Sequence, residues 1–169
     1  ASTPERRQIA ATGMLRSAAM SGNGEETILA ATAVLADAKV APELESEARH
    51  YRSKALVEAN QLTHAVADWE ALAKDTRNVY GAEAKYRLAQ YLFDSGKTKE
   101  AEQEVLNYLE VSTPHAYWLA RSFVLLSDIY AKLDRKLEAR QYLLSLKQNY
   151  QADDDIAGMI ESRLENLSE

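Results

Sequence analysis

Residues 86–109 read YRLAQYLFDSGKTKEAEQEVLNYL, two helix-forming stretches separated by the polar break Asp94-Ser95-Gly96-Lys97. On either side of the break, apolar residues recur at intervals of about three and four, with charged residues between them, which is typical of amphipathic helices. A break this short forces the two helices to run antiparallel as neighbours. The stretch therefore predicts a helical hairpin.

The same pattern recurs along the chain, with similar polar breaks at 21–24, 59–61 and 133–135. The second helices align at Thr27, Ala65, Ala101 and Ala139, so their spacings are 38, 36 and 38 residues. A repeat of this length indicates a solenoid of helix pairs, in which no pair buries its apolar face alone. Small residues suit these four positions, because antiparallel helices approach to about 8–10 Å only where the crossing is small.

The boundaries of the repeats follow from proline and glycine. All three prolines, Pro4, Pro42 and Pro114, lie where a repeat would open. Proline is tolerated in the first turn of a helix because its missing N–H would have no partner there. Gly81 is interpreted as the end of one helix and the opening of the third repeat. The predicted repeats are 3–41, 42–80, 81–115 and 116–151.

A final helix is predicted at 153–167. Its apolar residues fall on one face and are Ile156, Met159, Ile160, Leu164 and Leu167. We expect this helix to cap the last exposed apolar surface of the array, with one aspartate of 153–155 as its N-cap. The whole sequence, 1–169, is thus predicted to be one all-α solenoid domain.

Two groups of residues carry a family resemblance. Leu88, Ala89, Gly96, Ala101, Val105 and Tyr108, and then Leu126, Tyr130, Asp134 and Ala139, resemble the tetratricopeptide repeat pattern. Arg49 and Arg52 depart from it, because they stand where the pattern prefers bulky apolar or small residues. The resemblance implies a right-handed α-α superhelix of helix hairpins with a C-terminal capping helix.

A narrower resemblance involves 81–89, 113–121 and 153–155. These segments are similar to the C-terminal part of large multi-repeat proteins of Bacteroidetes. That resemblance implies a longer parent chain exported to the cell envelope or periplasm, while a cytoplasmic location stays open. The start of the sequence, which is neither Met nor a targeting signal, agrees with a trimmed or mature fragment.

In the tetratricopeptide family, the first helix of each pair lines a concave groove. The resemblance therefore implies that the partner-binding residues of this chain are Arg16, His50, Lys54, Tyr86, Gln90, Phe93, Arg121, Asp128 and Lys132. Arginine and lysine could hold a carboxylate or an acidic side chain, and Tyr86 and Phe93 could offer a flat surface to an extended or helical segment.

Composition limits the classes of function. The chain has 169 residues with 46% apolar content, enough to bury a continuous core. Its net charge of −6, with acids and bases mixed, argues against nucleic-acid binding by bulk electrostatics. The absence of cysteine excludes disulfides and thiolate metal sites. No run approaches the roughly 18–20 apolar residues of a membrane span.

Enzyme motifs are weak or missing. Glu47 and His50 have the Glu-x-x-His spacing of di-metal helical bundles, but the second copy that such a site needs is missing. There is no Gly-x-Ser-x-Gly turn and no glycine-rich phosphate loop. The acids of 153–155 are consecutive, unlike the alternating acids of a calcium loop. We therefore predict no catalytic residue, no metal site and no cofactor.

The predicted function is a non-catalytic protein–protein interaction scaffold that presents a concave helical groove to a protein or peptide. The alternative is a structural spacer within a longer solenoid, with no ligand of its own. An uncovered apolar face at Met14, Leu15, Ile28 and Leu29 would favour that alternative. A helical enzyme or small-ligand sensor would require a polar pocket with convergent titratable groups, which the sequence does not indicate.

Overall fold

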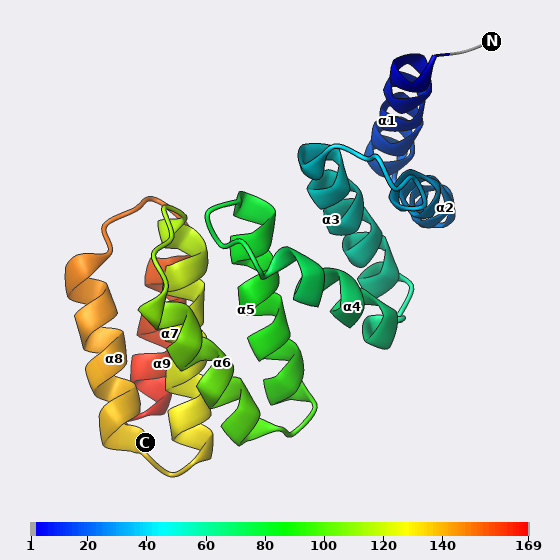
Figure 1. Cartoon of the computed structure of the whole chain (residues 1–169). Coiled ribbons are helices and arrows are strands. Elements are labelled where there is room, and N and C mark those ends of the chain that lie inside the picture. Colours follow the sequence, from blue (N-terminus) through cyan, green and yellow to red (C-terminus); the bar gives the residue numbers. More distant parts are fainter. Residues whose placement is uncertain (1–2, 169) are drawn as a thin grey trace. The chain divides into compact units, whose positions relative to one another are not determined.

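The computed structural model describes residues 3–168, and within that range the chain forms helices and no strand (Figure 1). The predicted all-α class is confirmed. Residues 1, 2 and 169 of the predicted domain lie outside the described residues. The helices are α1 (Pro4–Ser21), α2 (Gly24–Leu35), α3 (Pro42–Glu58), α4 (Leu62–Leu72), α5 (Val79–Asp94), α6 (Thr98–Glu110), α7 (Ala116–Lys132), α8 (Lys136–Asn149) and α9 (Ile156–Asn166).

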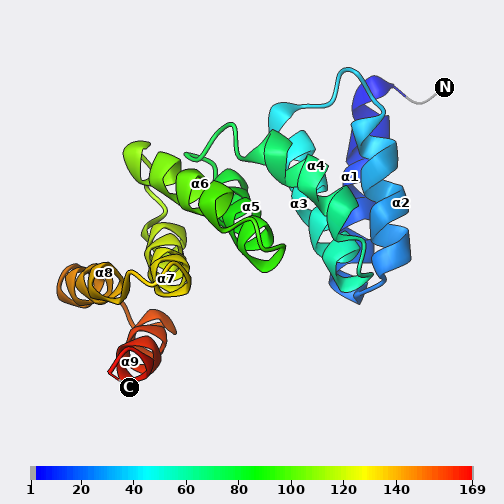
Figure 2. The same cartoon turned by 90° about the horizontal axis from the view of Figure 1, so that it is seen from below.

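The chain divides into two compact units, residues 1–74 (unit 1) and 75–169 (unit 2). In unit 1, α2 packs against both α1 and α3, and α3 packs against α4 and touches α1. In unit 2, α7 packs against α5, α6, α8 and α9, and Figure 2 shows it with α8 and α9 at its side. Within each unit, the first helix of a pair therefore contacts both helices of the pair before it.

Each of the four hairpin turns contains one residue with positive φ: Gly22 (71°), Asn60 (57°), Gly96 (77°) and Asp134 (60°). The residue that follows each positive-φ residue donates its N–H to the carbonyl of the residue five positions before it. Lys97 donates to Leu92 at 2.9 Å, and Arg135 donates to Tyr130 at 2.8 Å. This bond is the mark of the Schellman motif, which satisfies carbonyls at a helix C-terminus. The turns thus repeat with the same spacing as the second helices.

The same substitution at two glycines of unit 2 should change the stability in opposite directions. An added Cβ at Gly96 or Gly158 would meet nothing within 4 Å, but only Gly96 has a positive φ. We expect Gly96→Ala to lower the free energy of unfolding by about 1 kcal/mol through backbone strain. Gly158→Ala, inside α9, should raise it by up to about 1 kcal/mol through helix propensity. Urea unfolding followed by circular dichroism measures both, and changes of the same sign would contradict the turn geometry.

The residues that align the second helices are buried as predicted. Thr27 is 4% exposed, and Ala65, Ala101 and Ala139 are each 0% exposed. In unit 2, one buried cluster joins α5, α6 and α7 to Ala139 of α8, and a second joins α7 and α8 to α9. Because α7 contributes to both clusters, the core of unit 2 extends from α5 to α9.

The last helix, α9, packs against α7 and α8. Ile156 and Ile160 are 0% and 2% exposed and pack in the cluster that contains Leu143 of α8. Asp155 occupies the N-cap position of α9, but its side chain makes no capping bond. Asp154 makes it instead, because its Oδ1 accepts from the N–H of Ile156 at 2.9 Å. The carboxylate of Asp155 is thereby left for contacts with α7.

The predicted boundaries need one correction. Pro4 and Pro42 lie in the first turns of α1 and α3, and Pro114 lies two residues before α7. Gly81, however, does not end a helix: it is buried inside α5, which begins at Val79. Asn78 caps α5 by accepting from the N–H of Tyr80 at 2.8 Å. A glycine inside a helix costs only about 1 kcal/mol, which capping and packing offset.

Arg49 and Arg52, the departures from the repeat pattern, bind a buried carboxylate in unit 1. Asp68 of α4 is 0% exposed. Arg52 donates two bonds to its carboxylate oxygens, at 2.8 and 2.7 Å, and Arg49 donates a third at 3.2 Å. Arg52 also donates to the hydroxyl of Thr32 on α2 at 3.2 Å. A single buried acid therefore links α4 to α3, and through Arg52 to α2.

Candidate partner-binding surfaces

Three of the predicted partner-binding residues form one hydrogen-bonded chain on the first helices of unit 2. Arg121 of α7 donates to the hydroxyl of Tyr86 on α5 at 2.9 Å. Tyr86 donates to Oε1 of Gln90 at 3.0 Å, and Gln90 donates to Asp94 at 2.9 Å. Because a chain of hydrogen bonds restricts rotamers, these polar groups are held in place. Tyr86, however, is only 4% exposed and belongs to the core cluster of unit 2, so its ring is not the open flat surface that was predicted.

The same arginine also reaches the start of α9. Arg121 donates to the Tyr117 hydroxyl at 3.2 Å and to the Asp155 carboxylate at 3.4 Å, and Tyr117 donates to Asp155 at 3.3 Å. Partial burial opposes the charge of Arg121, but the hydroxyls of Tyr86 and Tyr117 outweigh it, so its pKa lies above the ordinary value. The guanidinium is thus a permanent cation at the centre of this surface.

Aromatic rings lie beside two arginines of this region, Arg121 on α7 and Arg87 on α5. The guanidinium of Arg121 lies 5.0 Å from the ring centre of Tyr86, and that of Arg87 lies 5.6 Å from the ring of Trp118. Trp118 is 5.6 Å from Tyr86 and packs edge-on against Tyr117 at 5.0 Å. Sequence reasoning did not include Arg87, Tyr117 or Trp118 in the surface. Their cation–π and ring contacts make it more aromatic than predicted.

The remaining predicted residues of unit 2 lie in different settings. Asp128 is bound by Arg163 of α9 at 2.8 and 2.9 Å, so it is not a free acid. Phe93 is half-buried and packs against the core cluster of α5 to α8. Lys132 is exposed at the end of α7. The structure therefore leaves Lys132 open to solvent, and Arg163 is a residue that sequence reasoning missed.

Unit 1 contains an open groove between α1 and α3 with a volume of about 540 Å³. Arg16 of α1 donates to both oxygens of Glu47 on α3, at 2.6 and 2.8 Å. Gln8 donates to the carbonyl of Lys39, before α3, at 3.0 Å. The groove is lined by Glu5, Gln8, Ile9, Thr12, Gly13, Arg16, Ala41, Glu43, Leu44 and Glu47.

Arg16 is the one predicted residue of unit 1 that lines this groove. His50 is partly buried, and its ring lies 5.5 Å from that of Tyr51. Lys54 is exposed further along α3. The structure thus places His50 and Lys54 beyond the groove that contains Arg16.

We expect unit 2 to lose stability at alkaline pH. Burial raises the pKa of Tyr130 to about 12, helped by Tyr142 and Glu102 and opposed by Arg135, whose guanidinium lies 4.1 Å from its ring centre. The neutral phenol is thus favoured in the folded state. Its contribution to stability is present below the ordinary value of about 10 and is lost as pH rises from there to about 12.

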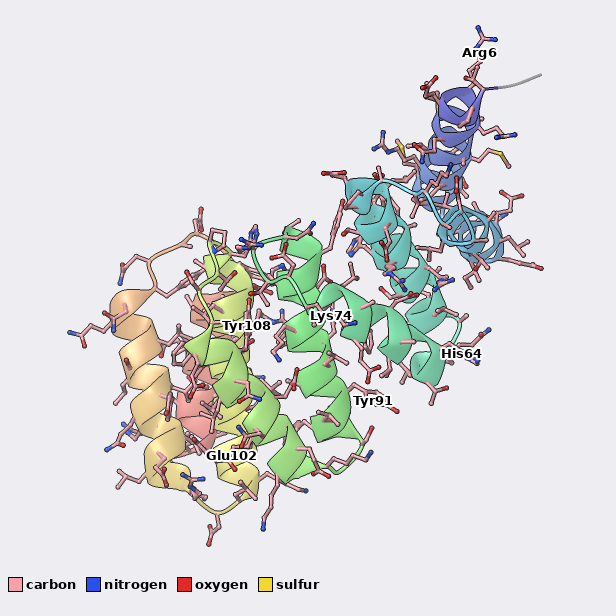
Figure 3. All side chains as sticks on the ribbon, in the orientation of Figure 1. Arg6, His64, Lys74, Tyr91, Glu102 and Tyr108 are labelled. Carbon is pink, nitrogen blue, oxygen red and sulfur yellow. The ribbon has the colours of Figure 1, made fainter. Side chains whose placement is uncertain are left out.

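Denaturation midpoints measured across this window check the prediction. The midpoint should fall with rising pH, and it should fall less steeply in Tyr130→Phe, which has no phenol to ionise. Tyr108, on α6 (Figure 3), and Tyr150 also have raised pKa values because of burial, so part of the dependence should remain. An equal slope in the variant would contradict the assignment to Tyr130.

In residues 3–168, the possible metal ligands are scattered over the fold. In that range, no group of three or more His, Cys, Asp or Glu side chains is arranged to hold a metal ion. Glu47, the acid of the Glu-x-x-His spacing, is bound to Arg16. His64 lies exposed at the start of α4 (Figure 3). No helix in the described part of the chain has the length and apolar character needed to cross a bilayer.

Comparison with known proteins gives no relative: no family model, no curated protein and no solved structure matches this chain.

Proposed function

We propose that this protein is a non-catalytic interaction scaffold, in which tetratricopeptide-like helix hairpins form an α-α superhelix and present their first helices to a protein partner. The packing within each unit supports the proposal, since α3 in unit 1 and α7 in unit 2 each touch both helices of the pair before them. Repeat arrays of this kind characteristically bind partners on extended surfaces.

The observation that carries the proposal is the fixed cation–aromatic cluster of α5, α7 and the start of α9, in which Tyr86 is 4% exposed and the Arg121 side chain keeps 22% of its surface in solvent. Arg121 is bonded to Tyr86, Tyr117 and Asp155, and its guanidinium also lies over the ring of Tyr86. Arginine and aromatic side chains are the residue types that contribute most to interface affinity. Because they are held by one another, little side-chain entropy is lost when a partner binds.

The test uses Lys132, because it is exposed on α7 and its replacement disturbs no contact of Arg121. We would replace Lys132 with the photo-crosslinking residue benzoylphenylalanine in native cells, and Gln141, exposed on α8, in a matched control. The proposal expects one discrete crosslinked protein at Lys132 and none at Gln141. Equal products from the two positions, or none from either, would contradict a partner on the first helices.

The spacer function is a second candidate with partial support. Met14 and Leu29 are 68% and 65% exposed, but Leu15 is fully buried and Ile28 is partly buried. Two of the four residues are thus uncovered, as a neighbouring helix pair would require. A spacer without a ligand expects no crosslink at Lys132, so the same experiment separates the two functions.

A further inference from the structure

We infer that the groove between α1 and α3 binds a protein segment in which a lysine or arginine stands next to an aliphatic residue. The inference rests on the proposed scaffold function and names the chemistry of one ligand. It depends on three features of unit 1: the charge of the groove, an exposed aliphatic side chain, and one position of α1, Gly13, that has no side chain.

The groove carries an excess of acid. Three of its lining residues are glutamates, Glu5, Glu43 and Glu47, and a single cation, Arg16, faces them. Arg16 is already paired with Glu47. Arg6 does not line the groove and extends outward at the start of α1 (Figure 3). The exposed carboxylates of Glu5 and Glu43 therefore favour a cationic ligand and disfavour an acidic one.

The groove also offers an aliphatic contact. Ile9 lines it with 72% of its surface exposed, while Leu44, which lines it from α3, is only 9% exposed. An aliphatic residue of the ligand would cover Ile9 and gain hydrophobic energy that a purely basic segment cannot. The combination predicts a segment with both kinds of side chain and disfavours polylysine-like chains.

Gly13 leaves the backbone of α1 bare within this groove. A glycine inside a helix costs about 1 kcal/mol relative to alanine. Packing does not demand it here, because an added Cβ would meet nothing within 4 Å. An open position at Gly13 lets a ligand approach the helix closely, so a large side chain there should fill the groove without disturbing the fold.

The experiment uses the full chain and three fluorescein-labelled peptides, measured by fluorescence anisotropy at low salt. The probes are Gly-Leu-Lys-Leu-Lys-Gly, its charge-reversed form Gly-Leu-Glu-Leu-Glu-Gly, and Gly-Ser-Lys-Ser-Lys-Gly, which keeps the charge without the aliphatic residues. The inference expects the first peptide to bind at least about tenfold more tightly than either of the others. Equal binding of the charge-reversed peptide would overturn it.

Two variants locate the binding. The affinity for the first peptide should fall by about tenfold or more in each of them. One is Gly13→Phe, which blocks the groove, and the other is the double variant Glu5→Lys with Glu43→Lys, which reverses the charge of the groove. Glu25→Lys with Glu26→Lys is the matched control, since both acids are exposed on α2 and should leave binding unchanged. Unaltered binding in Gly13→Phe, with a circular dichroism melt like that of the parent, would overturn the inference. A Lys132 crosslink without peptide binding would leave the scaffold function standing and remove this ligand.

Discussion

Asp68→Ala should lower the free energy of unfolding of unit 1 by about 3 kcal/mol. The variant leaves the guanidinium groups of Arg49 and Arg52 facing each other without the carboxylate that now accepts three bonds from them. Both arginine side chains keep 25% and 21% of their surface in water, which places the loss at the lower end of the range for broken buried ion pairs.

The two tryptophans make this measurement specific. Trp69 lies in unit 1 and Trp118 in unit 2, so in a Trp118→Phe background the fluorescence during urea unfolding reports unit 1 alone. Glu70→Ala is the matched control, because Glu70 is an exposed acid on the same helix, and it should change stability by less than about 0.5 kcal/mol. A loss of similar size in both variants would mean that the bonds of Asp68 add no more to the free energy of unfolding than an exposed acid of the same helix does.

Ala101→Trp should destabilise unit 2 by about 3 kcal/mol or more. Ala101 is 0% exposed where α6 crosses its neighbours, in the cluster that also contains Leu126 and Ile129. An indole has no space there, so it must separate the helices or force its neighbours into unfavourable rotamers.

Ala157→Trp provides the comparison for this variant, since Ala157 is exposed on α9. There the same substitution should cost only about 0.5 kcal/mol through helix propensity. Thermal unfolding followed by far-UV circular dichroism measures both. An unchanged melting temperature for Ala101→Trp would show that Ala101 does not mark a tight crossing.

The helices and turns were largely predictable because their signals are local. The four polar breaks each contain the residue that adopts positive φ, and Gly, Asn and Asp are the residues that adopt it most readily. Gly81 led to a wrong boundary because its effect depends on the residues around it. A glycine weakens a helix but does not end it when a capping residue such as Asn78 stands just before the first turn.

The candidate surface was predictable only in part. The helix that carries each residue followed from the repeat, and Tyr86, Gln90 and Arg121 do meet. Two of the predicted residues are bound by side chains one repeat further along the chain. Arg121 is bound to Asp155, 34 residues later, and Asp128 is bound to Arg163, 35 residues later. Complementary charges at that spacing were a usable signal. Which of two neighbouring side chains points to the core, as Phe93 partly does, depends on packing that spacing does not specify.

The Schellman turns bear on how the chain folds. Each turn is closed by backbone bonds between residues no more than five positions apart. A hairpin turn can therefore form before distant segments of the chain come into contact. Folding dominated by such short-range closures is fast, and it can start at any of several places. Damage to one hairpin would therefore leave the others as independent starting points for folding.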